Sequence, residues 1–454
     1  MTSLLAPEVL VLATAFLGVL VLAAQWYTPV RALQVLLITA VLTPLQMSSG
    51  LSASIALTGF LIVAWVLQSL VIRRRIAIDG SRVAVAALAF TAITIVSFIG
   101  GQYPWFPVAP APMRAQLGGL GLFVLSTGLF LFVGHQVRTV AALQKLTWWF
   151  IGTGGLAVTI TLIGFNVITI GPIEVFNART IGSAFWVWVV AISLSQALYN
   201  SDLLPAARLG AATVAIAALA RGLVFAFSWA SGWLPPLVTA AVIVALRFPR
   251  TAIVGAVLLA GPAVVVASPV FEALLAGGES YSWMTRVEAA RLTLQMLAHS
   301  PLIGFGPANY YEYTVLFPIL GWWVRFNSHN NYLDMLAQTG VLGLLAFAWF
   351  AMETLLLCVS LAAKKKPGFV RAYLTGALAG LVGTLVAGLL ADWIVPFAYN
   401  LGLEGFRSSL LIWLFLGGVL SLKRILSIAP NPTNIGIQGR QWSPRSLPGA
   451  AAAV

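Results

Sequence analysis

The 454-residue chain contains one cysteine, three histidines and so few charged residues that they make up only 8% of it. Soluble domains contain about a quarter charged residues, so the composition excludes an ordinary soluble protein. The single cysteine, Cys358, excludes a disulfide or a multi-cysteine metal site within the chain. Patterns of the Gly-x-x-x-x-Gly-Lys, His-Glu-x-x-His and Cys-x-x-Cys types are also absent, which argues against a P-loop ATPase and an intramembrane zinc protease.

Apolar sequence takes the place of these features. Hydrophobic residues make up 60% of the chain and the mean hydropathy is +0.97. Runs of about twenty apolar residues, the length that crosses a bilayer as a helix, recur along it. We therefore predict an all-α polytopic membrane protein with about twelve or thirteen spans. The candidate spans are residues 8–26, 32–47, 52–72, 83–100, 116–134, 146–166, 181–199, 207–227, 232–247, 251–270, 334–362, 371–391 and 407–422.

The two ends of the chain carry separate expectations. The N-terminus lacks a basic segment and a small-residue cleavage site, so residues 9–25 are expected to be retained as the first span. Residues 1–423 are expected to form one transmembrane domain. Residues 424–454, rich in Pro, Gly and Ser, are expected to form a disordered cytoplasmic tail.

The net charge of +13 is spread over short clusters between the spans rather than along one basic stripe, which does not favour nucleic-acid binding. Of the 25 basic residues, eighteen fall in one set of alternating loops. Because cytoplasmic loops carry the excess of Lys and Arg, the seven others are expected on the outer face: Arg114, Arg179, Arg221, Arg286, Arg291, Arg325 and Arg407. ATP and nucleotide sugars are not available on that face.

Residues 271–332 form the longest polar segment between spans and are expected to be a large periplasmic or extracellular loop. This loop contains two of the three histidines, His299 and His329, and three of the outer arginines. A chain with so few ionisable groups concentrates them here, so we expect the functional site in this loop. Within it, Gly304 and Gly306 follow Pro301 and allow positive φ or a close approach of backbone.

His329 has two interpretations. A histidine near neutral pH can accept a proton and act as a general base. The alternative is structural, since its neighbours Ser328, Asn330 and Asn331 are residues that cap helices, and an apolar helix follows. His299, before Ser300-Pro301, resembles a turn residue.

The arginines are similarly open to two interpretations. Arg286 begins an amphipathic stretch that runs to Leu297 and could form an anion site at the membrane surface, whereas Glu288 and Arg291 could simply form a surface ion pair on it. Arg179 is expected at the outer mouth of the seventh span. Arg221 falls within the apolar eighth span, where a charge indicates either a functional site or a side chain that reaches the interface.

Residues 329–343 also carry a recognisable motif. His329-Asn330-Asn331-Tyr332-Leu333, followed by Gln338-Thr339-Gly340-Val341-Leu342-Gly343, resembles the signature of the bacterial O-antigen ligase and polysaccharide polymerase family. Upstream, Arg286 with Pro301–Gly306 is similar to that family's loop arginine and Pro-x-x-Gly-x-Gly, and Arg179 is similar to its earlier arginine. Departures from the family pattern are Gln338 in place of glutamate, Ala290 in place of tryptophan, and Ser228-Trp229-Ala230 where Ser-Arg is usual.

This resemblance implies a GT-C-like glycosyltransferase of the bacterial cytoplasmic membrane whose active site faces the periplasm. The implied donor is a glycan on undecaprenyl diphosphate, and the acceptor is another glycan, a lipid A core or a protein. Arg286 and Arg179, with Arg221, would hold the diphosphate, and His329 would remove the acceptor proton during an inverting transfer. Neither metal nor other cofactor is expected, and Arg291, Asn330, Gly304 and Gly306 are expected to line the substrate site.

Two other function classes remain open at this stage. A transporter or flippase for lipid-linked oligosaccharides would also be polytopic, but such proteins tend to contain internal repeats, and the sequence has no matching halves. A structural membrane component would not need arginine and histidine gathered on one face.

Overall fold

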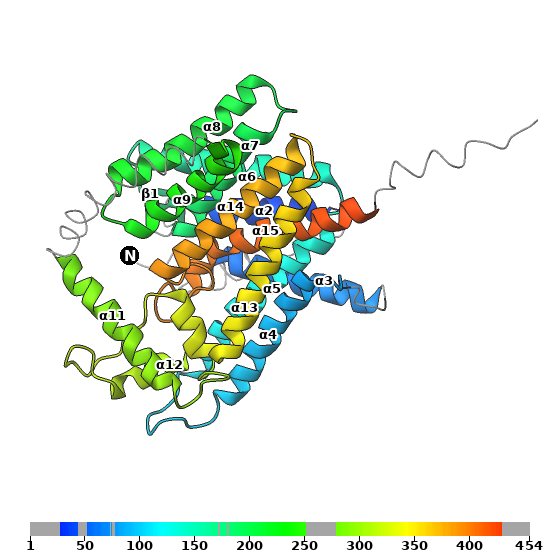
Figure 1. Ribbon diagram of the computed structural model, residues 1–454. Helices are drawn as coiled ribbons and strands as arrows, with labels where there is room; N and C mark the ends of the chain where they lie inside the picture. The colour runs from blue at the N-terminus through cyan, green and yellow to red at the C-terminus, as the bar shows by residue number, and fades with distance from the viewer. Residues whose placement is uncertain are drawn as a thin grey trace, which may run out of the picture.

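The computed structural model describes residues 28–43, 52–72, 74, 78–170, 173–178, 181–250 and 278–428, and over these ranges the chain is a bundle of helices (Figure 1). The helices of the first half are α2 (Pro29–Val41), α3 (Ala53–Val71), α4 (Arg82–Gly100), α5 (Met113–Gln136), α6 (Val140–Leu162), α7 (Ser183–Tyr199), α8 (Pro205–Ala220), the π-helical turn η2 (Arg221–Phe225) and α9 (Ala230–Arg247). Those of the second half are α11 (Gly278–Leu297), α12 (Asn309–Tyr313), η3 (Thr314–Leu316), α13 (Asn331–Ala363), α14 (Phe369–Leu390), η4 (Leu403–Gly405) and α15 (Phe406–Ile428).

Eight of the described helices are long and apolar enough to cross a membrane, which confirms an all-α polytopic membrane protein. Each predicted span from 32–47 to 232–247, and each from 334–362 onward, contains a helix. The predicted spans 8–26 and 251–270 lie outside the described residues. The last helix continues to Ile428, beyond the expected start of the tail at residue 424.

Hydroxyl side chains fix several helix starts. Ser52, Ser81 and Thr139 each accept a hydrogen bond from a backbone N–H three residues on, at Ile55, Ala84 and Ala142 respectively. Such caps satisfy one of the four N–H groups that a helix start leaves without a partner. Thr139 explains why α6 begins six residues before the span that hydropathy alone predicted.

The most deeply buried helices are α7, α14 and α15, which lie among the others in Figure 1. The Trp188 ring of α7 stacks on the Phe415 ring of α15, with centroids 5.2 Å apart and an angle of 12°. Gly380 of α14 faces Trp188 so closely that a Cβ would lie 3.0 Å from the ring. Small residues that let helices approach are typical of membrane bundles, where packing replaces the hydrophobic driving force.

Contacts between helix ends define two opposite faces. On one face, Arg407 at the start of α15 donates to the carbonyls of Ala40 and Val41 at the end of α2, and the Ser408 hydroxyl accepts from Gly182 N before α7. On the other, Lys423 of α15 pairs with Asp79 at 2.9 Å. The first face contains arginines that the charge count assigned to the outside, so we call it the outer face.

The outer face contains a short antiparallel hairpin, β1 (Val167–Ile170) and β2 (Ile173–Asn177), between α6 and α7. It was not predicted, because strands of four and five residues are too short for the long hydropathy windows that identify spans. The described part of the 271–332 loop is more helical than a polar loop suggests. Its α11 includes the stretch to Leu297 that was predicted to be helical and, with α12, lies to one side of the bundle (Figure 1).

Candidate active site

The site is built on a break in α13. Gly340 interrupts that helix with φ 66° and ψ −172°, a conformation that glycine alone adopts readily. The break frees carbonyls before it and N–H groups after it. Phe305 N and Gly306 N donate to the carbonyls of Ala337 and Gln338, at 2.9 and 3.0 Å.

The same loop also accepts hydrogen bonds from the far side of the break. Val341 N donates to Pro301 O at 2.8 Å and Leu342 N donates to Leu302 O at 3.1 Å. Residues 301–306 therefore satisfy all four backbone groups and fasten the outer loop to α13.

Glycines make this contact possible, as the sequence predicted. Gly304 and Gly306 have φ of 65° and 83°. A Cβ on Gly304 would lie 2.6 Å from Ala337 O, and a Cβ on Gly306 would lie 2.8 Å from Ser97 O. Gln338, the residue that departs from the family pattern, is buried and committed to structure, since it accepts from Ala308 N and donates to Asp334 O.

The start of α13 holds the residues around His329. Asn330 is the N-cap, and its side-chain oxygen accepts from Tyr332 N and Leu333 N. The buried Asn331 accepts from Ile394 N and Val395 N and donates to Val395 O, which ties α13 to the loop after α14. The capping interpretation of this polar run is thus correct for Asn330, while His329 takes no part in the cap.

His329 itself has φ 48°, one of four non-glycine residues with positive φ among those described. Its side chain is exposed, and its ring has no hydrogen-bond partner within the described part of the chain. Surrounding protein and the positive charge of Arg286 hold the pKa of the His329 ring below its ordinary value. A free, neutral imidazole on strained backbone is able to accept a proton, and strain of this kind gathers at functional sites.

Arg286 lies near His329, on α11. Its Nη1 donates to Leu390 O at the end of α14, at 2.9 Å, and Asn330 Nδ2 donates to the adjacent Leu389 O at 3.3 Å. Nε and Nη2 of Arg286 have no partner among the described residues. The C-terminal carbonyls of α14 therefore orient the guanidinium and leave donors free for an anion.

An acidic residue that the sequence analysis did not single out lies beneath His329. Asp334 is only 1% exposed, and its Oδ1 accepts from Ser328 Oγ at 2.7 Å and from the Tyr310 hydroxyl. Burial and the Asp334 carboxyl raise the pKa of the Tyr310 phenol, which keeps its proton and donates. Ser328 Oγ also accepts from Asn330 N, at 3.1 Å, so Asp334 is linked to the backbone on both sides of His329.

Arg221 lies elsewhere on the outer face, in the π-helical turn that ends α8. Its guanidinium carbon is 4.8 Å from the Trp186 ring centroid, and its buried Nη1 has no partner within the described residues. The same holds for buried polar atoms of three other residues: Ser183, Trp186 and Trp393. Trp393 precedes the backbone that Asn331 binds, so this second cluster shares the 391–397 loop with the His329 site.

The structure separates the remaining candidates. Arg291 forms the surface ion pair with Glu288, at 2.6 Å, and is 54% exposed. Arg179 lies outside the described residues. His299 lies in the turn after α11, where its Nδ1 lies 3.1 Å from Met296 O and its ring packs on Phe106. Within the described ranges no group of three or more His, Cys, Asp or Glu could hold a metal ion.

Comparison with known proteins finds one family over the region that contains these residues. Residues 175–348 match the family model described as O-antigen ligase, a range that includes Arg221, Arg286, His329 and the break at Gly340. No curated protein matches the chain significantly. The match covers the region that contains these residues, so this part of an apolar helical bundle is similar to the O-antigen ligase family.

Proposed function

We propose that this chain transfers a glycan from a polyprenyl diphosphate, undecaprenyl diphosphate in the family that residues 175–348 resemble, to an acceptor hydroxyl on the outer face of the bacterial cytoplasmic membrane. The observation that carries the proposal is the pairing of a free imidazole with a partly free guanidinium. His329 has no hydrogen-bond partner among the described residues, and Arg286 keeps Nε and Nη2 available beside it.

In this mechanism the acceptor oxygen attacks the anomeric carbon, and the bond from that carbon to the diphosphate oxygen breaks with inversion. His329 takes the proton of the acceptor hydroxyl. Arg286 neutralises the charge that develops on the departing diphosphate through charge-assisted hydrogen bonds. Diphosphate is a good leaving group, so positioning and charge neutralisation supply the acceleration.

Asp334 acts as a positioning residue. Its carboxyl holds Ser328 Oγ, which binds the backbone of Asn330, so the pair fixes the residues on both sides of His329. A left-handed backbone at a non-glycine residue costs about 1–3 kcal/mol, and these contacts offset that cost. Asp334→Asn keeps the acceptor Oδ1 and should retain more activity than Asp334→Ala, with an unchanged acid limb of the pH–rate profile.

The arginine of the second cluster would bind a more distant part of the donor. Arg221 Nη1, Trp186 Nε1 and Trp393 Nε1 are buried without partners in the described part of the chain. Buried polar groups normally have partners, and a phosphate or sugar hydroxyl could supply them. The acceptor is a glycan, a lipid A core or a protein side chain.

The test uses the purified chain with an undecaprenyl-diphosphate glycan and each acceptor class. We expect glycan transfer with release of undecaprenyl diphosphate, and a loss of about 10²–10⁴-fold in His329→Ala. His299→Ala is the matched control, because that histidine bonds to the backbone at the end of α11, and it should transfer normally. Full activity in His329→Ala would refute the role of His329 as the general base. Movement of the glycan across the bilayer without bond cleavage would identify a flippase instead.

A further inference from the structure

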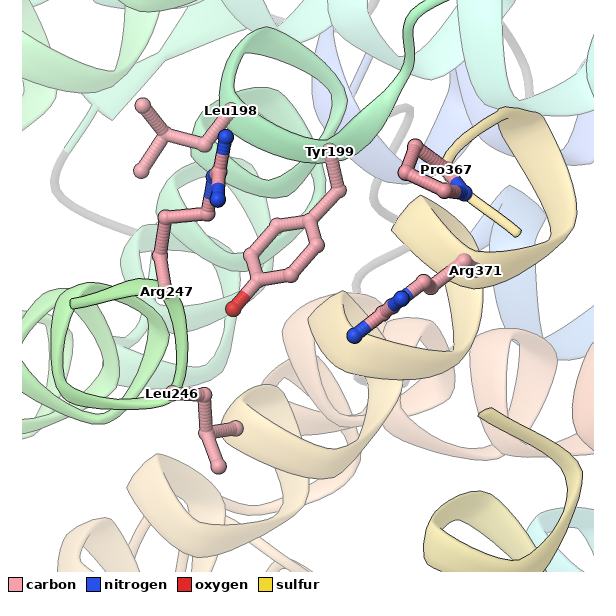
Figure 2. A pocket seen from close by; sticks show the side chains of 6 residues that line it. All are labelled: Leu198, Tyr199, Leu246, Arg247, Pro367 and Arg371. Carbon is pink, nitrogen blue, oxygen red and sulfur yellow. The ribbon is translucent and has the colours of Figure 1, made fainter. Parts of the chain in front are cut away.

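A cavity lies at the end of the bundle opposite the His329 site. Its volume is about 110 Å³, and its wall is formed by the last residues of α7 and α9 and the first residues of α14. One water occupies about 10–15 Å³ on this measure, so the cavity has room for a group several times larger. The lining residues are Leu198, Tyr199, Leu246, Arg247, Pro367 and Arg371 (Figure 2).

Two arginines converge on this cavity. The guanidinium carbons of Arg247 and Arg371 each lie 5.9 Å from the centroid of the Tyr199 ring, which stands between them in Figure 2. Tyr199 is 6% exposed, and its hydroxyl donates to Ile243 O. The ring is therefore fixed, and it holds two cations from different helices close together.

Neither cation has an acidic partner among the described residues. Arg371 Nη1 donates weakly to Lys365 O, at 3.3 Å, and Arg247 has no hydrogen bond there. The nearby Asp202 carboxylate accepts from Phe369 N at the start of α14 and forms no ion pair with either arginine. Two like charges side by side are unfavourable, so an anion between them would be stabilised by both.

The remaining walls are apolar. Leu198, Leu246 and Pro367 line the cavity, and Leu246 and Phe248 are 50% and 45% exposed at the end of α9. This end belongs to the face that the count of basic residues predicts to be cytoplasmic. An apolar rim beside two cations, at the ends of membrane helices, fits a lipid with a charged headgroup better than a fully water-soluble anion.

We propose that this cavity binds the headgroup phosphate of an anionic phospholipid, held between Arg247 and Arg371, with its acyl chains along Leu246 and Phe248. The Tyr199 ring keeps the two guanidinium groups in place. The site is separate from the glycan-transfer site and does not depend on it. Basic pockets between membrane helices at the cytoplasmic side are suited to such headgroups.

The experiment titrates the purified full chain in detergent with phosphatidylglycerol, phosphatidylcholine and inorganic phosphate, and measures bound molecules by native mass spectrometry. We expect phosphatidylglycerol to bind more tightly than phosphatidylcholine. The double variant Arg247→Gln/Arg371→Gln should lose that affinity by roughly tenfold or more.

The matched control is Arg250→Gln/Lys366→Gln, which removes the same charge from exposed positions that do not line the cavity. It should bind phosphatidylglycerol within about twofold of the unaltered chain. Thermal unfolding establishes that both variants are folded. Equal losses in the two variants, or equal binding of the two lipids, would overturn the site. Inorganic phosphate that displaces phosphatidylglycerol at similar concentrations would overturn the lipid as its occupant.

Discussion

The break in α13 allows a quantitative test through Gly340→Ala. Gly340 has φ 66° and ψ −172°, and a Cβ there would lie 2.2 Å from Leu302 O and 2.5 Å from Ile303 N. Both contacts are to backbone, so no side chain can move aside. The loop must shift, or Gly340 must change conformation.

The expected cost has two parts. An alanine forced into this region of φ and ψ costs about 1–3 kcal/mol. Moving the loop breaks some of the four backbone hydrogen bonds between residues 301–306 and α13, each worth about 0.5–1.5 kcal/mol. The loss of two brings the total to about 2–6 kcal/mol.

Substitutions at two other glycines distinguish the cost of backbone strain from the cost of a steric clash. Gly321→Ala places an alanine at a backbone φ of 88°, but its Cβ would have no contact within 4 Å, so the substitution should cost only the backbone strain. Gly210→Ala, in α8 with open space around it, should be neutral or slightly stabilising. Thermal unfolding in detergent, followed by tryptophan fluorescence, ranks the three variants. If Gly340→Ala is no less stable than Gly321→Ala, the account of the α13 contact is wrong.

Three further predictions concern single side chains. The lowered pKa of His329 should keep the imidazole neutral, and transfer active, at pH values below the ordinary histidine pKa. Because Arg286→Gln removes one cause of that shift, the acid limb of its pH–rate profile should move to higher pH. An unmoved limb would contradict the electrostatic coupling of Arg286 to His329. Arg407→Leu removes hydrogen bonds of 2.6 and 2.8 Å to the end of α2 and should lower the unfolding free energy by about 2–4 kcal/mol. An unchanged midpoint of thermal unfolding would argue against a stabilising role for these hydrogen bonds. Arg291→Gln disrupts only an exposed ion pair and should change the transfer rate by less than about threefold. A loss of transfer rate as large as that in Arg286→Gln would indicate that Arg291 belongs to the substrate site.

The sequence was informative where chemistry and backbone geometry leave local signals. Glycines after Pro301 indicated a close approach of backbone, and the structure places Gly304 against α13 and Gly306 against the end of α4. The polar run before α13 indicated both a cap and a base, and Asn330 is the cap. The roles of His329 and Arg286 remain predictions, although the structure brings the two residues close enough to interact electrostatically.

What the sequence did not reveal depends on distant neighbours. Asp334 follows the histidine motif within an apolar span, and a lone acid there is itself a signal of function. Its partner Tyr310, however, comes from α12, and no pattern links the two in sequence. The break in α13 was hidden for a similar reason. Hydropathy averages over Gly340, and the loop that satisfies the broken helix lies 32 to 40 residues earlier.

The contact between α15 and α2 bears on how the chain is made. Arg407 belongs to the last helix that the structure describes, yet it binds the final carbonyls of the first, more than 360 residues away. Helices are inserted into the membrane in sequence order during translation. The carbonyls of α2 therefore lack these hydrogen bonds until α15 has been inserted. Chains that stop before Phe406 would keep that defect, and membrane proteases that recognise unfinished helices should remove them.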